Sequence, residues 1–294
     1  MGRSWSLTTE RKGTVGGDLV EIPAAWVAQA AECQPQSPSS APTGAPGARM
    51  IIQIVTTHQT PDTDALSAAA ALWWCLAPGA TPQVNFDSSL SSAAHVPAEG
   101  HFVVDIGLGE LDHHQFDDPR SACAFGLVVE YIATHGTAEQ QARAVGLRAL
   151  IPLVLAQDST GRIFDDPDQQ QASLPAMLNR LVWAHQDDQA AWRDAWTILR
   201  IVFDAVAGNG EAPKYWMRQD SILRALDGDG KYQLAQFLVD LDVQETRART
   251  AVASDPHAVC SAYGVQVIGN VASYEVSLTA GRFGNGHHKK GTPL

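Results

Sequence analysis

The sequence predicts an α/β protein whose central part is a doubly wound, mainly parallel sheet. Apolar runs at Ile51–Val55 and His101–Gly107 alternate with helical stretches, which is typical of parallel β-α units. From Leu174 to Val252 the periodicity is almost wholly helical. We therefore expect a sheet domain over 50–161, a helical region over 162–252 and a small α/β substrate-binding piece over 253–294.

The first 49 residues are expected to be an extension of this domain. Residues 34–47 are rich in Pro, Ser and Gly, which is the composition of a linker and not of a packed element. We expect this extension to be poorly ordered.

Composition limits the classes of function. The 294 residues carry a net charge of −12, which argues against tight binding to a long nucleic-acid duplex, because such binding needs a basic face. The four cysteines form no CxxC pair, so neither a zinc ribbon nor a disulfide framework is indicated. No apolar run reaches the length of a membrane span, and Met1–Thr14 lacks a signal-peptide core. These features predict a cytoplasmic protein that does not bind a membrane.

The stretch Met50–Leu76 is the first with chemistry. A strand at Ile51–Val55 should lead through a turn to an alanine-rich helix ending near Leu76. His58, Asp62 and Asp64 lie between them, at the carboxyl end of the strand, where open α/β sheets place their ligands. A divalent metal would offset the crowded carboxylates. The alternative is a turn in which the aspartates, Asp64 in particular, cap the helix and the histidine is incidental.

A second acidic site follows a predicted strand at Pro82–Asp87 and a loop at Ser88–Glu99. The strand His101–Gly107 should present Asp105 where it ends, although Asp105 could also be a turn-capping residue. Asp112-His113-His114 comes shortly afterwards. Adjacent histidines point in different directions, so one can bind metal while the other faces a substrate, with Asp112 orienting an imidazole. A solvated polar loop is the alternative.

The helical stretches add a fourth acidic site. We predict helices at Ala124–Thr134 and Ala138–Ala156, the second kinked at Pro152 and followed by Asp158. Further helices are predicted at Leu174–His185, Gln189–Ala207, Trp216–Leu226 and Tyr232–Val252. The apolar repeat Trp192, Trp196, Leu199 and Phe203 is expected to pack in the core, in preference to the alternative of a base-stacking platform. A solvated loop is expected around Asp165, Asp166 and Asp168, and a turn at Asp227–Gly230.

The chain end combines glycines with basic residues. Strands are expected at Val265–Gly269 and Tyr274–Thr279, followed by a segment that could grip phosphate through close backbone amides and cationic side chains. A flexible basic tail is the alternative. The candidate substrate-binding residues are Arg282, Gly284, Gly286, His287, Lys289 and Lys290.

Taken together, the acidic and histidine sites resemble the DHH phosphoesterase superfamily over about 50–161. That superfamily includes RecJ-type exonucleases, nanoRNases, cyclic dinucleotide phosphodiesterases and family II inorganic pyrophosphatases. The motifs that carry the resemblance are, in order, His58-Gln59-Thr60-Pro61-Asp62-Thr63-Asp64-Ala65, Asp105, Asp112-His113-His114 and Asp158. The short spacing from Asp105 to Asp112 resembles the branch of Myg-type proteins. Gly284-Asn285-Gly286-His287 is similar to the GGGH signature of the associated C-terminal domain, with asparagine at its second position.

The resemblance implies a ligand scheme for two divalent ions. His58 and Asp62 would hold one ion, and Asp64, His113 and Asp158 the other, with Asp105 bridging both. His114 would face the phosphate and Asp112 would orient the histidines, so that Asp105, Asp112 and His114 form the catalytic set. A carboxylate-rich site with two imidazoles suits manganese, with magnesium or cobalt as alternatives, better than zinc.

The activity implied is hydrolysis of phosphodiester bonds in short oligonucleotides or dinucleotides, through a water activated by two metal ions. Two alternatives stay open. The wording Pro61-Asp62-Thr63-Asp64-Ala65 also resembles the manganese-dependent inorganic pyrophosphatases. A nucleotide-binding regulator without turnover could keep the same fold. Each of the three hypotheses predicts a small phosphate-containing partner, and a homodimer is compatible with all of them.

Overall fold

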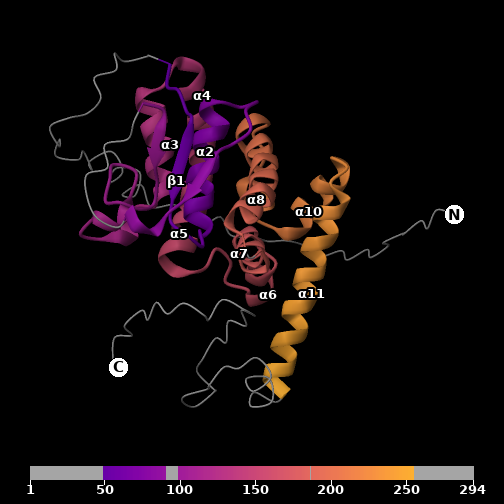
Figure 1. Cartoon of the computed structure of the whole chain (residues 1–294). Coiled ribbons are helices and arrows are strands. Elements are labelled where there is room, and N and C mark those ends of the chain that lie inside the picture. The colour runs from indigo at the N-terminus through magenta and orange to yellow at the C-terminus, as the bar shows by residue number, and fades with distance from the viewer. Residues whose placement is uncertain (1–48, 91–98, 186, 255–294) are drawn as a thin grey trace. The chain divides into compact units, whose positions relative to one another are not determined.

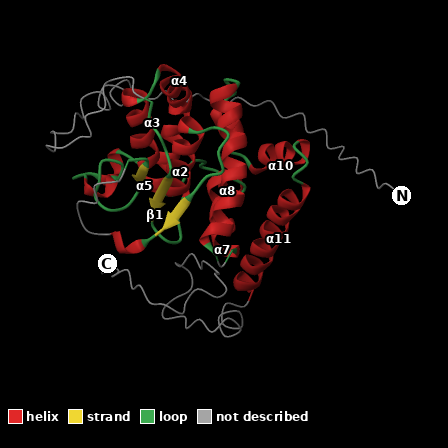
Figure 2. Cartoon of the chain, turned by 45° about the horizontal axis from the view of Figure 1, so that its top comes forward, coloured by secondary structure: helices red, strands yellow, loops and turns green. Residues whose placement is uncertain are grey.

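Three short parallel strands form the sheet, with the first strand in the middle (Figure 2). The structure is a computed structural model that describes residues 49–90, 99–185 and 187–254. Strand β1 (Ile54–Thr57) pairs with β2 (Val84–Phe86) on one side and with β3 (His101–Val103) on the other. Val55 lies opposite Val84 and Phe102 in this register. Because all strands run the same way, their carboxyl ends meet at one edge of the sheet.

The third strand is shorter than the sequence predicts. We expected His101–Gly107, but β3 ends at Val103. The reason is local, since Asp105 has a φ of 55° and Gly107 a φ of 85°, both in the left-handed region that a strand cannot contain. The chain therefore turns at Asp105, and the Asp105 amide donates to the Leu111 carbonyl, 3.1 Å away.

Helix α2 (Thr63–Leu76) is the central helix of the described residues (Figure 1). All 14 of its residues are buried, and it packs against β1 and against α3, α4, α5, α7 and α8. The alanines at 68–71 are fully covered, which lets neighbouring elements approach the helix backbone closely. Asp62 is the N-cap, and its Oδ1 accepts the Ala65 amide at 3.0 Å.

Helices α3 (Ala124–His135), α4 (Ala138–Leu147) and α5 (Ile151–Thr160) follow. The single kinked helix predicted for Ala138–Ala156 is wrong. A 3-10 turn separates α4 from α5, and Pro152 lies in the first turn of α5, where its missing N–H leaves no helical bond unmade. Asp158 consequently lies in the last turn of α5 and not beyond a helix.

Six further helices lie between residues 162 and 254 of the described chain. They are α6 (Pro167–Gln171), α7 (Leu174–Ala184), α8 (Asp188–Phe203), α9 (Pro213–Trp216), α10 (Gln219–Gly228) and α11 (Tyr232–Ser254). A π-helical turn, Asp204–Gly208, continues α8.

This helical region corrects three predictions. The block predicted as a solvated loop contains α6, because Asp166 caps that helix by accepting the Asp168 amide. The predicted Trp216–Leu226 helix is two elements, α9 and α10. The predicted Gln189–Ala207 helix ends as an α-helix at Phe203. The turn predicted at Asp227–Gly230 is confirmed, with Gly230 at a φ of 72°.

One hydrophobic core extends from Ile52 to Leu238. Trp192, Leu199 and Phe203 are buried in it and Trp196 packs against it, which confirms the prediction that this apolar repeat is core. No helix among the described residues is long and apolar enough to cross a membrane. The strands predicted at Val265–Gly269 and Tyr274–Thr279 lie outside the described residues, as does the predicted extension up to residue 48.

Candidate metal centre

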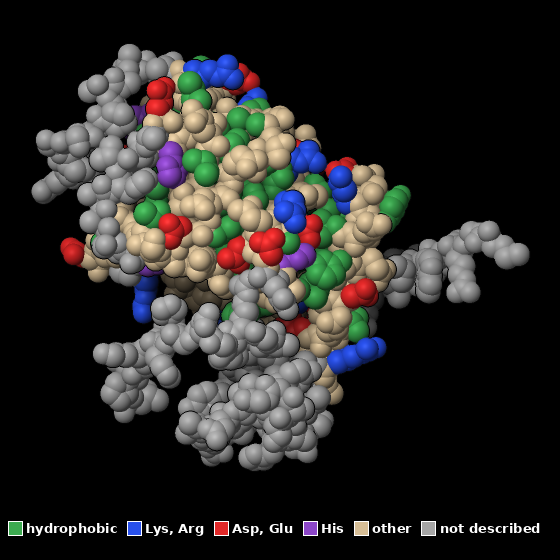
Figure 3. All heavy atoms as spheres, in the orientation of Figure 1, with side chains coloured by type: hydrophobic (Ala, Val, Ile, Leu, Met, Phe, Trp, Pro, Cys, Tyr) green, Lys and Arg blue, Asp and Glu red, His purple; other side chains and the backbone are tan. Residues whose placement is uncertain are grey.

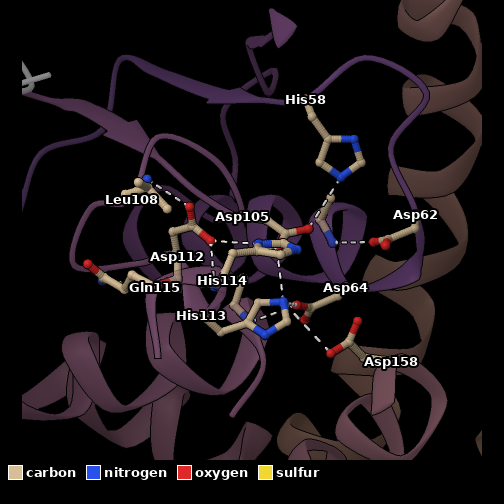
Figure 4. Close-up of polar contacts among 12 residues, drawn as sticks. His58, Asp62, Asp64, Asp105, Leu108, Asp112, His113, His114, Gln115 and Asp158 are labelled. Atoms are coloured by element: carbon tan, nitrogen blue, oxygen red, sulfur yellow. Dashed lines mark hydrogen bonds and ion pairs between the residues drawn. The ribbon is translucent and has the colours of Figure 1, made fainter. Parts of the chain in front are cut away.

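Histidine and aspartate side chains from four segments meet at the carboxyl edge of the sheet (Figure 4). His58 follows β1, and Asp62 and Asp64 lie at the start of α2. Asp105 follows β3. The turn after Asp112 supplies two histidines, and α5 supplies Asp158. The described residues contain three groups whose candidate ligand atoms all lie within 4.8 Å of one another: His58, Asp62 and Asp105; Asp64, His113 and Asp158; and Asp105, His113 and His114.

Asp105 is the residue that joins these groups. Its Oδ2 lies 3.3 Å from His58 Nε2, and its Oδ1 lies 3.3 Å from His113 Nε2. Figure 4 shows the Asp105 carboxylate between the two imidazoles. The side chain is only 2% exposed, and Oδ1 accepts no hydrogen bond of standard geometry. A buried carboxylate oxygen in that state calls for a cation, because burial without a partner costs free energy.

The group on the β1 side is the more exposed one. His58 Nδ1 faces the Gln59 carbonyl at 3.0 Å, which directs Nε2 at Asp105. Asp62 uses Oδ1 to cap α2. Capping and metal binding are therefore compatible for this residue, since capping occupies one carboxylate oxygen. The His58 side chain is 25% exposed.

The second group is buried. His113 Nε2 lies 3.7 Å from Asp64 Oδ2 and 3.7 Å from Asp158 Oδ2. The sequence allowed Asp64 to be the cap of α2, but the cap is Asp62. The two oxygens of Asp64 instead accept the amides of Ala124 (2.6 Å) and Phe125 (2.9 Å) at the start of α3. These bonds fix the carboxylate in the orientation that faces His113.

Asp112 and His114 form a separate pair beside Asp105. Asp112 Oδ1 lies 2.7 Å from His114 Nδ1, and the same carboxylate accepts the amides of His114 (3.0 Å) and Leu108 (2.8 Å). Asp112 is buried, whereas the His114 side chain is 56% exposed. The buried carboxylate therefore holds an imidazole that solvent and small molecules can reach.

The ionisation of the centre reflects crowded carboxylates. Burial, followed by the nearby Asp105 carboxylate, raises the pKa of Asp64 to about 7. Burial also raises the pKa of Asp158, with partial compensation by His113. For Asp105 burial acts in the same direction, but the imidazoles of His113 and His58 outweigh it and hold its pKa below the usual value.

Both reachable histidines are shifted towards the protonated form. Burial of His58 favours the neutral imidazole, yet the Asp105 carboxylate and the Gln59 carbonyl together raise its pKa to about 9. Hydrogen bonding to Asp112 raises the pKa of His114. Protons on these imidazoles offset part of the negative charge of the surrounding carboxylates.

The donor set fits hard divalent ions. Four carboxylates and three imidazoles make up the three groups. Among the described residues, the Cys123 thiol interacts with Asp64, and burial and the Asp64 carboxylate raise its pKa well above the usual value. Oxygen-rich sets of this kind suit manganese or magnesium better than zinc. The chain can therefore bind a metal ion through buried Asp and His side chains.

The structure brings together all eight predicted residues of 50–161: His58, Asp62, Asp64, Asp105, Asp112, His113, His114 and Asp158. The predicted substrate-binding residues Arg282, Gly284, Gly286, His287, Lys289 and Lys290 lie outside the described residues. Sequence reasoning missed two residues that hold the His58 loop, Ser88 and Asp188. Ser88 carried no signal in the sequence, and the acidic pair Asp187-Asp188 indicated only a helix start.

Comparisons with models of protein families, with curated proteins and with solved structures find no significant match. The function is therefore inferred from the geometry of these eight residues.

Proposed function

We propose that the protein is a metal-dependent phosphoesterase of the DHH type that hydrolyses phosphodiester bonds of short oligonucleotides or dinucleotides. The observation that carries the proposal is the position of Asp105, whose two carboxylate oxygens each lie 3.3 Å from a histidine of a different metal-binding group. One carboxylate shared between two cation sites is the arrangement that a two-metal phosphoesterase needs.

Each side chain has a defined task in this proposal. His58 and Asp62 would hold one divalent ion, Asp64, His113 and Asp158 the second, and Asp105 both. Two such ions, when bound, supply an activated water and offset the negative charge of a phosphate. The Asp64 carboxylate is held in its orientation by the amides of Ala124 and Phe125, independently of any substrate.

His114 is the residue best placed to contact the phosphate. Its ring lies 2.7 Å from Asp112 Oδ1 and is about half exposed. The hydrogen bond to Asp112 raises the pKa of His114. A protonated imidazole can donate a hydrogen bond to a phosphate oxygen or a proton to the leaving oxygen. Asp112 thus orients His114, and His114 performs the contact.

One further feature supports a small substrate, and another supports the proposed fold class. On the face drawn in Figure 3, basic side chains of the described residues are interspersed with acidic ones. Binding of a long duplex would need a continuous stripe of basic side chains. The described residues form a sheet of three parallel strands with the candidate site at its carboxyl edge, and this placement supports the proposal of a doubly wound domain. We propose manganese as the ion and the cytoplasm as the compartment.

A substrate panel tests the proposal. Purified full-length protein with MnCl2 would be incubated with labelled oligonucleotides of two to five nucleotides, cyclic dinucleotides and pyrophosphate, each with a parallel EDTA control. We expect manganese-dependent release of mononucleotides. Turnover of pyrophosphate alone would identify the pyrophosphatase alternative. Manganese-dependent binding without turnover would identify a regulator.

A further inference from the structure

The loop from His58 to Asp62 is held by contacts from outside itself. The Gln59 amide donates to Ser88 Oγ at 3.1 Å, and the Thr60 amide donates to Asp188 Oδ2 at 3.2 Å. Ser88 follows β2, whereas Asp188 lies in the first turn of α8, 128 residues from Thr60 along the chain. Two successive amides of the loop are therefore anchored by separate elements.

Thr60 needs such an anchor because its backbone is strained. Its φ of 54° lies in the left-handed region, which is unfavourable for a residue with a branched side chain. Thr60 lies two residues after His58 and two before Asp62. Relaxation of its φ would turn the chain on both sides and shift the two side chains relative to Asp105.

The helix that supplies the anchor is itself fixed against the sheet. Asp187 Oδ1 accepts the Gln189 amide at 3.0 Å and so caps α8, and the Gln189 side chain donates to the carbonyl of Val84, the first residue of β2. Helix α8 also packs against α2 and belongs to the continuous core. Asp188 is thus presented from a rigid element.

We propose that Asp188 is a positioning residue for the metal centre, which fixes the His58–Asp62 loop through the Thr60 amide. The inference rests on the proposed function, because it assigns those two residues to one of two metal ions. Asp188 acts on the His58 side alone, since Asp64, His113 and Asp158 are held by α3, the turn after Asp112 and α5. The helical region therefore contributes to the metal centre and does more than cover it.

Calorimetric titration of the full chain with MnCl2 tests this role, with three variants. Asp188→Ala should weaken binding of one Mn²⁺ by about tenfold or more and leave the other within twofold, the size of effect typical of residues that orient ligands. Asp188→Asn keeps a carbonyl oxygen that can accept the Thr60 amide, so it should retain most of the affinity. Asp187→Ala removes the α8 cap, but the Gln189 side chain and the core packing of α8 still hold the helix, so this variant should lower the melting temperature while leaving both affinities within about twofold of wild type.

Amide hydrogen exchange in EDTA gives a second readout that needs no metal ion. We expect faster exchange across residues 56–65 for Asp188→Ala, and wild-type exchange for Asp188→Asn and Asp187→Ala. Unchanged affinities in Asp188→Ala, or an equal loss in Asp187→Ala, would overturn the positioning role while leaving the phosphoesterase proposal intact. A wild-type protein that binds no Mn²⁺ would overturn both.

Discussion

The Asp105 carboxylate lies 3.3 Å from His58 Nε2, although 47 residues separate the two along the chain. They meet because β1 and β3 are neighbouring parallel strands, so residues just beyond their carboxyl ends share one edge of the sheet. The same carboxylate contacts His113 through its other oxygen. Each half of the proposed centre therefore depends on Asp105.

Asp105→Asn should abolish most of the activity. The amide keeps the volume of the carboxylate but loses the charge that both ions need. We expect hydrolysis to fall by about 100-fold or more and the affinity for each Mn²⁺ to fall by roughly tenfold or more. Turnover assays and manganese titration measure the two effects. Two ions bound at wild-type affinity would disprove the bridging role.

Single histidine substitutions should separate the two ions. His58→Ala should weaken the more exposed ion, and His113→Ala the buried one, because each imidazole belongs to a different group with Asp62 or Asp64. Manganese titration should give one strong site for each variant. His135→Ala is the matched control, since His135 belongs to none of the three groups, and it should keep both sites.

Asp64 should matter for folding even without metal. Its carboxylate accepts two buried amides at the start of α3, so Asp64→Ala leaves both without their partner. We expect a loss of about 2 to 4 kcal/mol in the free energy of unfolding, measured by urea denaturation in EDTA. His135→Ala, which removes an exposed ring outside the centre, should cost much less. Similar losses for the two variants would contradict this account.

The metal-free protein should lose stability as the pH rises from about 5.5 to 9. The pKa of Asp64, about 7, lies above its unfolded value, so the folded state holds the proton more tightly and this stabilisation disappears as the pH passes 7. The pKa of His58, about 9, is also raised, so its contribution disappears as the pH passes 9.

Manganese should reverse that trend, because bound ions require deprotonated ligands and replace the protons. Melting temperatures with EDTA and with MnCl2 at pH 5.5, 7 and 8.5 would therefore diverge as the pH increases. The divergence above pH 7 should shrink in His58→Ala. A manganese-induced increase in melting temperature that is constant across this range would rule out the proton linkage.

Deletion of residues 284–294 tests the predicted phosphate-gripping segment. The basic and glycine-rich sequence there predicts contact with the phosphate next to the scissile one. The truncated chain should show a higher KM for dinucleotides with both Mn²⁺ ions still bound. Hydrolysis of bis-p-nitrophenyl phosphate, which has no neighbouring phosphate, should change less. Equal losses on both substrates would indicate an ordinary tail.

The parallel strands, and the convergence of the histidines and aspartates at one edge of the sheet, could be predicted from the sequence. Apolar runs followed by His58 and Asp105 place both residues at strand ends, and the rule that parallel strands share a carboxyl edge brings them together. The sequence also predicts α3, α7 and α11 as helices, because the 3.6-residue period extends over three turns or more in each.

Backbone conformation and long-range contacts could not be predicted. The left-handed φ of Asp105 shortens β3, yet aspartate at a strand end gives no sign of it. Pro152 was interpreted as a kink because the pattern does not reveal that a new helix begins just before it. Asp188 reaches Thr60 across 128 residues, and a tertiary contact of that length leaves no trace in local sequence.

The complete burial of α2 restricts how this protein can diverge. A helix with one solvent face can accept neutral substitutions there, but the 14 residues of α2 have no such face. A larger side chain at any of its alanines would push apart the elements packed around it, and Asp62 and Asp64 at its start would move with them. In relatives that keep this chemistry, substitutions should therefore be concentrated in other helices. Helix α2 should change least, because it fixes the spacing of the carboxylates.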